Sequence, residues 1–406
     1  VGNQVWHANI SRRNFLAGSA TVAGLAAASS VLPTITAANA STEAKKNTLP
    51  DFAAWKNEQA VIVHSKSGIE TIREAIGSGI LTPIDNLYVR NNLPTMTDEA
   101  IGDKDKWTLS IEGVKNPKTF TLKQLKSMTP TTIAAVLQCS GNGRGFFAHK
   151  ASGSQWKTGA AGCVMWTGVA VTDLVKMCGG LASGVKFLTG TGADMPKDQD
   201  PKAALMERSV PLDVYKDAVL AWEINGEDLP NVHGAPLRLV TPGYFGVNNV
   251  KHLNKLAFTT TESQVKFMKS SYRVTPIGTK GSSDYPTCWE MNVKSWVTLP
   301  VADKGSVAAG KVTISGVAFG GLKELSNVEV SVDGGKNWKK AQLIGPNLGK
   351  FAWRQFAIEA DLKPGSYNVV SRASAGGKSQ PELRMENERA YLHNGWKDHG
   401  VTIQVA

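Results

Sequence analysis

Hydrophobic and polar positions alternate with a period of two along several short stretches in the last quarter of the chain. Residues 311–318 and 328–332 both show this alternation, and the second stretch runs into Asp333-Gly334-Gly335, a typical hairpin turn. Further strand-like runs follow at residues 351–358, 367–372 and 401–405. Repeated short strands separated by turn residues predict a β-sandwich over residues 301–406.

The preceding part of the chain mixes strand and helix patterns. Residues 107–111 alternate like a strand, and residues 122–128 predict a short helix. Residues 169–177 predict the start of a helix that ends at Gly179-Gly180, a typical C-cap. The dipeptides Asn225-Gly226 and Pro242-Gly243 predict turns between strands. This mixture indicates an α+β domain over residues 41–300 rather than a regular doubly wound sheet.

The first 40 residues read as an export signal. Ser11-Arg12-Arg13-Asn14-Phe15-Leu16 is a twin-arginine signature, and a weakly apolar stretch and Ala38-Asn39-Ala40, an A-x-A cleavage site, follow it. The apolar stretch is short and contains several glycine, serine and threonine residues, so it is a poor membrane anchor. We therefore expect residues 1–40 to be a removed signal peptide and the mature protein to be periplasmic. This route exports proteins that are already folded.

Composition narrows the classes of function. Removing a leader with two arginines leaves 43 basic against 34 acidic residues, and the lysines are scattered along the chain. No nucleic-acid-binding module is recognisable, so the positive charge indicates a solvated basic surface or an anionic partner.

The four cysteines lack C-x-x-C and C-x-x-C-H spacing, which argues against a c-type haem, a zinc site or an iron–sulfur site in this chain. Cys163 and Cys178 lie in apolar segments and are expected to be core residues.

The candidate chemistry centres on Cys139. This cysteine follows the apolar run 133–137 after one residue, Gln138. It precedes the turn Ser140-Gly141-Asn142-Gly143, and Arg144 lies five residues after it. A strand that ends in a small-residue turn holds a thiol at a cavity edge, where backbone can approach closely. A thiolate binds soft metals, although a single cysteine in such a position is also typical of a small buried hydrophobe.

The segment resembles the Cys-x-Gly-Asn-x-Arg motif of the sulfite oxidase family, in which the cysteine ligates molybdenum in a pyranopterin cofactor. The resemblance covers nearly everything after the leader. It continues, in the family's order and with roughly its spacing, through Val89-Arg90-Asn91-Asn92, Gln155-Trp156, Gly192-Ala193-Asp194, Arg208-Ser209-Val210-Pro211, His233-Gly234-Ala235-Pro236-Leu237-Arg238, Pro242-Gly243-Tyr244-Phe245-Gly246, Val250-Lys251 and Val293-Lys294-Ser295-Trp296.

The resemblance implies oxidation of sulfite to sulfate by oxygen-atom transfer at Cys139-ligated molybdenum. A small oxyanion requires planar, permanently charged donors, and arginine provides them. The residues that match family positions at the substrate are Arg90, Cys139, Arg144, Trp156, Tyr272 and Arg389. The tyrosine can donate a hydrogen bond to a metal oxygen ligand or to the substrate, and the tryptophan is expected to form a pocket wall. The match around Arg389 is weaker than the others.

The resemblance also implies a set of residues that bind the cofactor, whose terminal phosphate needs cationic and backbone donors. These are Arg90, Asn92, Cys139, Asp194, His233, Arg238, Gly246 and Lys251. Gly246 would permit close backbone approach, and the Asp194 carboxylate would accept hydrogen bonds from the pterin amino groups. Asn92 is a departure, because the family has Arg-Asn-His where this chain has Arg90-Asn91-Asn92. An asparagine keeps hydrogen bonding but cannot titrate near neutral pH.

We therefore predict a periplasmic sulfite dehydrogenase that passes electrons to a separate carrier, a c-type cytochrome, since no haem is expected in this chain. In the family the C-terminal domain is immunoglobulin-like and commonly forms a homodimer. The alternative is an exported molybdenum enzyme that reduces methionine sulfoxide; that enzyme lacks the C-terminal sandwich and the arginine-rich pocket. Assimilatory nitrate reductase shares the two-domain core but carries haem and flavin domains. A non-enzymatic module that kept the fold would not need Cys139, Arg144, Arg238 and Lys251.

Overall fold

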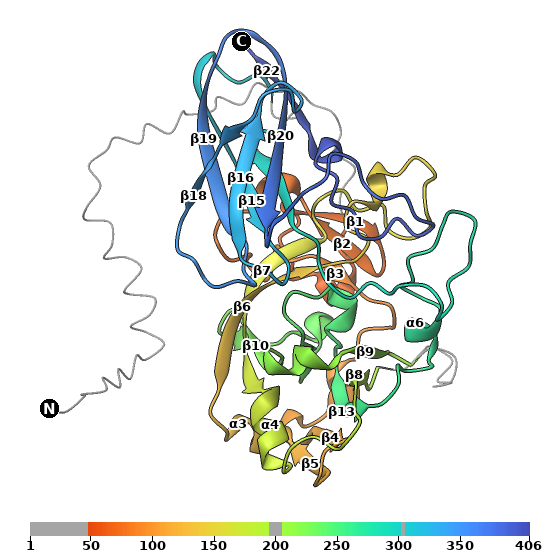
Figure 1. Cartoon of the computed structure of the whole chain (residues 1–406). Coiled ribbons are helices and arrows are strands. Elements are labelled where there is room, and N and C mark those ends of the chain that lie inside the picture. The colour runs from red at the N-terminus through yellow and green to blue at the C-terminus, as the bar shows by residue number, and fades with distance from the viewer. Residues whose placement is uncertain (1–47, 195–204, 302–304) are drawn as a thin grey trace, which may run out of the picture. The chain divides into compact units, whose positions relative to one another are not determined.

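The computed structural model describes residues 48–194, 205–301 and 305–406, so the predicted signal peptide lies outside the described residues. Over these residues the chain forms five sheets of short strands and four short α-helices (Figure 1). The helices are α2 (Asp98–Ile101), α3 (Leu122–Lys126), α4 (Val171–Met177) and α6 (Lys266–Lys269). Strands therefore dominate the mixture that the sequence predicts.

One sheet carries the strand that leads to Cys139. Its strand order is β11-β10-β7-β6, and β12 pairs with β10. Strands β6 and β7 run antiparallel from the pair Thr131–Gly168 to the pair Gln138–Ala161. The last four residues of β6 are all buried, which explains why this segment is a continuous apolar run rather than an alternating one. The bounds are β6 (Thr131–Gln138), β7 (Ala161–Ala170), β10 (Val219–Ile224), β11 (Glu227–Asp228) and β12 (Arg238–Val240).

A second sheet has the order β5-β4-β13-β8-β9, in which β4 and β13 are parallel. Leu109 of β4 and Leu256 of β13 lie in the largest apolar cluster, together with Leu125 of α3 and Leu174 of α4. Both helices therefore contribute their apolar side chains to the core of this sheet. The bounds are β4 (Thr108–Glu112), β5 (Lys118–Thr121), β8 (Phe187–Gly192), β9 (Glu207–Pro211) and β13 (Leu253–Thr259).

A small antiparallel sheet near the start of the described chain positions Arg90. It consists of β1 (Val61–Ser65), β2 (Gly68–Thr71) and β3 (Val89–Arg90), in that order. Arg90 pairs with Gly68, where a Cβ would lie 2.6 Å from the Ser154 hydroxyl oxygen. A larger residue at position 68 would therefore displace the Ser154 side chain, because this sheet packs closely against the segment that follows the Cys139 loop.

The C-terminal part forms two antiparallel sheets, drawn in blue in Figure 1. One has the order β14-β15-β19-β18; the other has the order β17-β16-β20-β21, with β22 paired to β20. Val297, Ile314 and Phe356 of the first sheet share one apolar cluster with Val328 and Ile403 of the second, so the sheets pack face to face. The bounds are β14 (Lys294–Leu299), β15 (Gly310–Phe319), β16 (Leu325–Ser331), β17 (Lys339–Lys340), β18 (Gln342–Ile344), β19 (Arg354–Leu362), β20 (Gly365–Ala375), β21 (Lys378–Ser379) and β22 (Val401–Val405).

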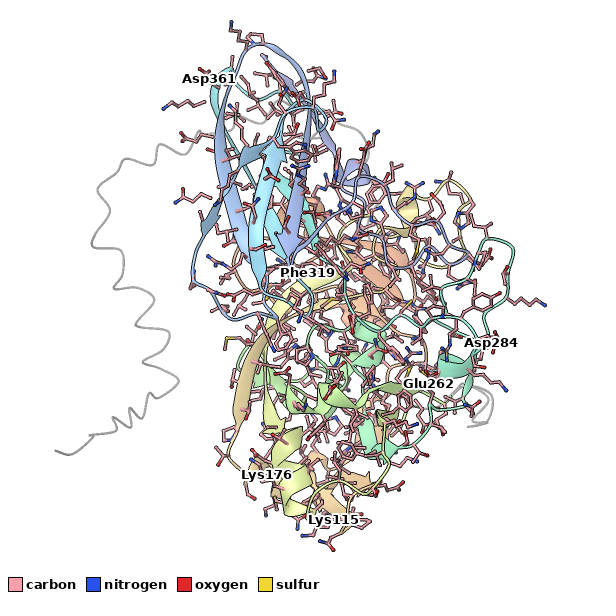
Figure 2. All side chains as sticks on the ribbon, in the orientation of Figure 1. Lys115, Lys176, Glu262, Asp284, Phe319 and Asp361 are labelled. Atoms are coloured by element: carbon pink, nitrogen blue, oxygen red, sulfur yellow. The ribbon has the colours of Figure 1, made fainter. Side chains whose placement is uncertain are left out.

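The C-terminal sheets contact the sheet that carries Cys139. Phe319, labelled in Figure 2, shares an apolar cluster with Val136 of β6 and Ala161 of β7. At the edge of this cluster, the Lys294 amine donates to the carbonyl of Asn142 at 3.2 Å, and the Leu392 amide donates to the carbonyl of Ser140 at 3.0 Å. The loop that contains Cys139 is therefore held by residues from the far end of the sequence.

The predicted elements are largely confirmed, with one correction. Strands occupy every alternating stretch predicted after residue 300, and α3 begins at the predicted residue behind a Thr121–Gln124 capping box. The prediction that a helix begins at Val169 was wrong, because Val169 and Ala170 belong to β7 and α4 begins at Val171. Val169 pairs with Leu220 of β10, so the sheet extends past the point where the local pattern becomes helical.

Candidate active site

Two cavities meet at Cys139. The first has an empty volume of about 730 Å³, and the second has an empty volume of about 1,610 Å³. We call them the cofactor cavity and the vestibule. Five residues line both: Arg90, Asn92, Cys139, Ser140 and Tyr272. The thiol therefore lies at the junction of the two cavities, as expected for a group at a cavity edge.

Hydrogen bonds fix the turn that presents Cys139. The Cys139 amide donates to the carbonyl of Ala160 at 2.9 Å, and the Asn142 side chain bridges Gln138 and Ala160 at 3.1 Å each. Gly143 has φ +106°, and a Cβ there would lie 2.4 Å from the His393 ring. The turn therefore needs a glycine for both backbone conformation and space.

Arg144 extends from this turn into the vestibule wall and is only 5% exposed. Its Nε donates to the carbonyl of Arg389 and its Nη1 to the carbonyl of Ser154, both at 3.1 Å. No ion pair links Arg144 to a carboxylate within the described residues, so its charge is not neutralised there. Such a guanidinium is suited to bind an anion.

The vestibule as a whole is cationic. Its lining holds six positively charged side chains and one carboxylate, that of Glu388. Arg273 is compensated by Glu262, whose Oε2 lies 2.6 Å from Nη2 (Figure 2 labels Glu262). Glu388 accepts a hydrogen bond from the Gly278 amide at 2.8 Å, which ties two loops of the vestibule together. The cations are Arg90, Arg144, Lys266, Arg273, Lys280 and Arg389.

Tyr272 separates the cofactor cavity from the vestibule. Its hydroxyl donates to Oδ1 of Asn92 at 3.0 Å, so the asparagine that replaces the family's histidine holds the predicted active-site phenol. Tyr272 has φ +60°, an unfavourable conformation for a non-glycine residue. Burial raises the pKa of its phenol, so Tyr272 is a hydrogen-bond donor at neutral pH.

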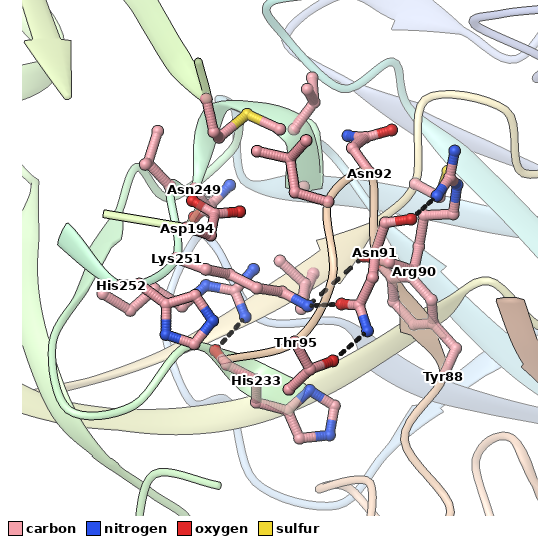
Figure 3. Close-up of a pocket in the computed structure, with 18 of the residues that line it drawn as sticks. Tyr88, Arg90, Asn91, Asn92, Thr95, Asp194, His233, Asn249, Lys251 and His252 are labelled. Atoms are coloured by element: carbon pink, nitrogen blue, oxygen red, sulfur yellow. Dashed lines mark hydrogen bonds between the residues drawn. The ribbon is translucent and has the colours of Figure 1, made fainter. Parts of the chain in front are cut away.

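One wall of the cofactor cavity gathers buried cations. The Lys251 amine donates to Oδ1 of Asn91 at 2.5 Å, and Arg238 donates to the carbonyl of His233 at 2.8 Å (Figure 3). Burial and the neighbouring Arg238 guanidinium lower the pKa of Lys251 well below its usual value. Burial lowers the pKa of Arg238 to about 10. A bound anion would offset the cost of burying these charges.

Three buried polar atoms of residues that line this cavity lack partners within the described part of the chain: Oγ of Ser140, Oδ1 of Asp194 and Nε of Arg238. Burial raises the pKa of Asp194 to about 6. Gly246 leaves room at the cavity, since a Cβ there would lie 2.9 Å from the Tyr88 hydroxyl oxygen. These unpaired groups are available to a ligand that carries both donors and acceptors.

Sequence reasoning missed His252, which belongs to this cavity wall, and Lys56, which contacts the wall residue His233 from outside the cavity lining. Lys56 is 4% exposed, and its amine lies 3.1 Å from Nε2 of His233. His252 lines the cavity, and its Nδ1 donates to the carbonyl of Ala235 at 2.5 Å, which leaves Nε2 as an acceptor. His252 directly follows the predicted Lys251, which was the only available signal for it. Nothing in the local sequence marks Lys56 as buried.

Every other predicted site residue lines at least one cavity, but Trp156 lines neither of the two. The expectation of a pocket-wall tryptophan is therefore corrected. Trp156 is fully buried and its ring packs edge-on against His64 at 5.0 Å. Its carbonyl accepts a hydrogen bond from Gly145 at 2.8 Å, so it supports the Arg144 turn from behind.

All four cysteines are free, and the three other than Cys139 are buried. Burial raises the pKa of both Cys163 and Cys288 to about 12, so these thiols stay protonated and unreactive.

The described residues contain no group of three or more histidine, cysteine or acidic side chains that could hold a metal ion. They also contain no helix long and apolar enough to cross a membrane.

Comparisons with known families match two regions of the chain. Residues 95–267 match the oxidoreductase molybdopterin binding domain. Residues 285–406 match the Mo-co oxidoreductase dimerisation domain. The first region contains Cys139 and the cationic wall of the cofactor cavity, and the second contains the two C-terminal sheets.

Full-length relatives and a solved structure agree with these matches. The chain is 29% identical to sulfite oxidase of Arabidopsis thaliana over 365 residues, which cover 83% of this chain and 91% of that protein. It is 30% identical to the mitochondrial sulfite oxidase of Homo sapiens over 82% of this chain, and it spans 63% of that protein's length. The crystal structure of the sulfane dehydrogenase SoxCD from Paracoccus pantotrophus matches 93% of this chain and 97% of that chain, with a TM-score of 0.70 and 26% identity.

Proposed function

The chain belongs to the sulfite oxidase family, and on that premise we propose that it oxidises sulfite to sulfate at a molybdenum pyranopterin ligated by Cys139. It is a molybdenum oxidoreductase with a molybdopterin-binding domain and a dimerisation domain. The observation that carries the proposal is the position of Cys139, between a cavity with a cationic wall and a vestibule lined by arginines. The first suits a large anionic cofactor and the second suits a small oxyanion.

The residues of the cofactor cavity fit the pyranopterin. Asp194, with an unpaired buried carboxylate oxygen, would accept hydrogen bonds from the pterin amino groups. His233, Arg238 and Lys251 would hold the terminal phosphate, and Gly246 would allow the backbone to approach. When bound, the molybdenum centre supplies the transferable oxygen and takes up two electrons.

The protein's own contribution is to bind and orient sulfite. Arg90, Arg144 and Arg389 line the vestibule beside Cys139 and would bind the three oxygens of the anion. On substrate binding, the Tyr272 hydroxyl would turn its single proton from Oδ1 of Asn92 to the reacting oxygen. Formation of sulfate adds one oxygen, supplied by water overall, and releases two protons and two electrons. The electrons leave to a separate carrier, which we propose is a c-type cytochrome.

Location and assembly follow from the same proposal. A twin-arginine signal at residues 1–40 would deliver the folded enzyme to the periplasm, followed by a catalytic domain over residues 41–300. We propose that the two paired C-terminal sheets form an immunoglobulin-like sandwich, the domain predicted over residues 301–406, and the match to a dimerisation domain supports a homodimer through it. Light scattering on the purified protein measures the mass of the assembly directly.

The test of the function is a metal analysis with a turnover assay. Protein matured with its cofactor should contain one molybdenum per chain and reduce both ferricyanide and a c-type cytochrome when sulfite is added. Molybdenum without sulfite oxidation would contradict the proposal and favour the reduction of methionine sulfoxide, which the same sample can be assayed for. A properly matured sample without molybdenum would exclude both reactions.

A further inference from the structure

A chain of aromatic and cationic contacts crosses the vestibule wall. The Arg208 guanidinium lies 5.5 Å from the centre of the Tyr272 ring. Tyr272 stacks on Tyr391 at 5.5 Å with an interplanar angle of 18°. The Arg144 guanidinium lies 5.5 Å from the centre of the Tyr391 ring. Tyr391 is therefore the residue that contacts both the predicted anion-binding arginine and the predicted active-site phenol.

The backbone around this stack is strained at three non-glycine residues. Tyr272 has φ +60°, and the residues on either side of Tyr391, Ala390 and Leu392, have φ +51° and +62°. Such conformations persist only where the surroundings determine them, and they gather at functional sites. Tyr391 itself is 5% exposed, so its ring is fixed by packing rather than by chance contact.

Hydrogen bonds hold the Tyr391 backbone in place and link the residue after it to the Cys139 turn. Its amide donates to Oδ1 of Asn387, and its carbonyl accepts from Nδ2 of Asn387, both at 2.9 Å. The next residue, Leu392, donates its amide to the carbonyl of Ser140 at 3.0 Å. The ring therefore keeps its place relative to the loop that carries Cys139 and Arg144.

An aromatic ring holds a guanidinium without neutralising it. A carboxylate partner would fix Arg144 but would also compete with the substrate for its charge, whereas carbonyl oxygens and a ring face leave that charge for an incoming anion. We propose that Tyr391 is a positioning residue for the substrate anion, whose ring fixes the Arg144 guanidinium and the Tyr272 phenol together at the vestibule. This inference rests on the proposed sulfite oxidation.

The experiment compares Tyr391→Leu with Tyr391→Phe in the molybdenum-loaded enzyme. The Phe variant keeps the ring and should retain both the KM for sulfite and the Kd for sulfate within about twofold. The Leu variant removes the ring and should raise both constants about tenfold, with a smaller change in kcat. Sulfate binding is measured by titration calorimetry on the oxidised enzyme, so it does not depend on turnover.

Tyr215→Leu is the matched control, because Tyr215 packs edge-on against Phe258 at 5.9 Å and lines neither cavity. It should lower the melting temperature without changing the KM or the sulfate Kd. Should Tyr391→Leu not fold, Tyr391→Met fills more of the space and gives the same comparison.

Two results would overturn the inference: a Leu or Met variant with the sulfate Kd of the original protein, or a Phe variant as impaired as the Leu variant. A purely structural role would lower the active fraction and kcat while leaving KM and Kd unchanged. Failure of the proposed function is distinct, because it would appear as a molybdenum-loaded original enzyme that does not oxidise sulfite, while the sulfate titration would still test the role of Tyr391.

Discussion

The Lys56 amine donates to Nε2 of His233 at 3.1 Å and to the carbonyls of Ile84 and Leu87 at 2.6 and 2.7 Å. Burial lowers the pKa of Lys56 to about 7. Below that pH its ammonium has three hydrogens, so these contacts use all of them and Nε2 of His233 is the acceptor. Burial and the neighbouring Lys56 charge lower the pKa of His233 well below its usual value, so the ring is neutral with its proton on Nδ1. Lys56 therefore sets which nitrogen of His233 can donate to an anion in the cofactor cavity.

Lys56→Met should weaken retention of the cofactor. Removing the ammonium frees the His233 ring to take the other tautomer and leaves two buried carbonyls without their donor. Changes to groups that orient a ligand of this kind typically cost about 10- to 100-fold in affinity. The measurement is the molybdopterin released from the protein during prolonged dialysis, quantified by fluorescence after oxidation.

Lys66→Met is the control for this prediction, because Lys66 is an exposed lysine in the turn between β1 and β2. It should retain the cofactor like the original protein. Equal retention by the Lys56 and Lys66 variants would show that Lys56 does not orient His233 for the cofactor.

Asp194 gives a prediction for pH dependence. Burial raises its pKa from 3.8 to about 6 in the chain without ligand. Between these values the folded state binds more protons than the unfolded state, so the stability of the cofactor-free chain falls as the pH rises from about 4 to about 6. Above that range the ionised carboxylate costs the folded chain about 3 kcal/mol.

Asp194→Asn should remove this cost. In urea denaturation of cofactor-free protein, the variant should gain stability over the original chain at about pH 7.5 and lose that advantage at about pH 4. The difference between the two proteins is the relevant quantity, because other groups titrate in both. A difference that does not change with pH would mean that Asp194 is not the group responsible.

Cys139→Ser tests the proposed metal ligand. Serine keeps the size and the backbone hydrogen bonds of the turn, so the fold and the melting temperature should be preserved. Sulfite oxidation should fall to background, because a hydroxyl is a far harder ligand than a thiolate. Cys163→Ser is the matched control for thiol loss elsewhere, since that buried cysteine lines neither cavity. Near-normal turnover of the Cys139 variant at full molybdenum occupancy would contradict ligation by this residue.

The sequence predicted those parts of the molecule that local patterns encode. Alternation marks β15 and β16 because each buries one face in the sandwich core, and the apolar run before Cys139 marks β6 because its end is buried on both faces. The site residues from Arg90 to Tyr272 were predicted by resemblance to a family, and the structure gathers all of them except Trp156 around the two cavities. Their chemical roles stay predictions.

The residues that were missed depend on contacts between distant segments. Lys56 lies in a polar stretch, and its burial arises only when that stretch packs against His233, 177 positions later. Tyr391 shows no pattern of its own, since its importance comes from stacking on Tyr272 and lying beside Arg144. Conversely, Trp156 matched a family segment but is enclosed by the core, because a resemblance in sequence does not fix which side of a wall a ring occupies.

Gly143→Ala should disturb the active site in two ways, through backbone strain at position 143 and through a steric clash of the new side chain. A non-glycine residue in the left-handed region costs about 1–2 kcal/mol. The new Cβ would also lie 2.4 Å from the His393 ring, so the Arg144 turn or the ring must move. Gly226→Ala separates the two effects, because Gly226 has φ +82° and a Cβ there meets nothing within 4 Å. Both variants should lose stability in urea denaturation, and only Gly143→Ala should also raise the KM for sulfite. An unchanged KM in that variant would mean that the His393 contact does not position Arg144.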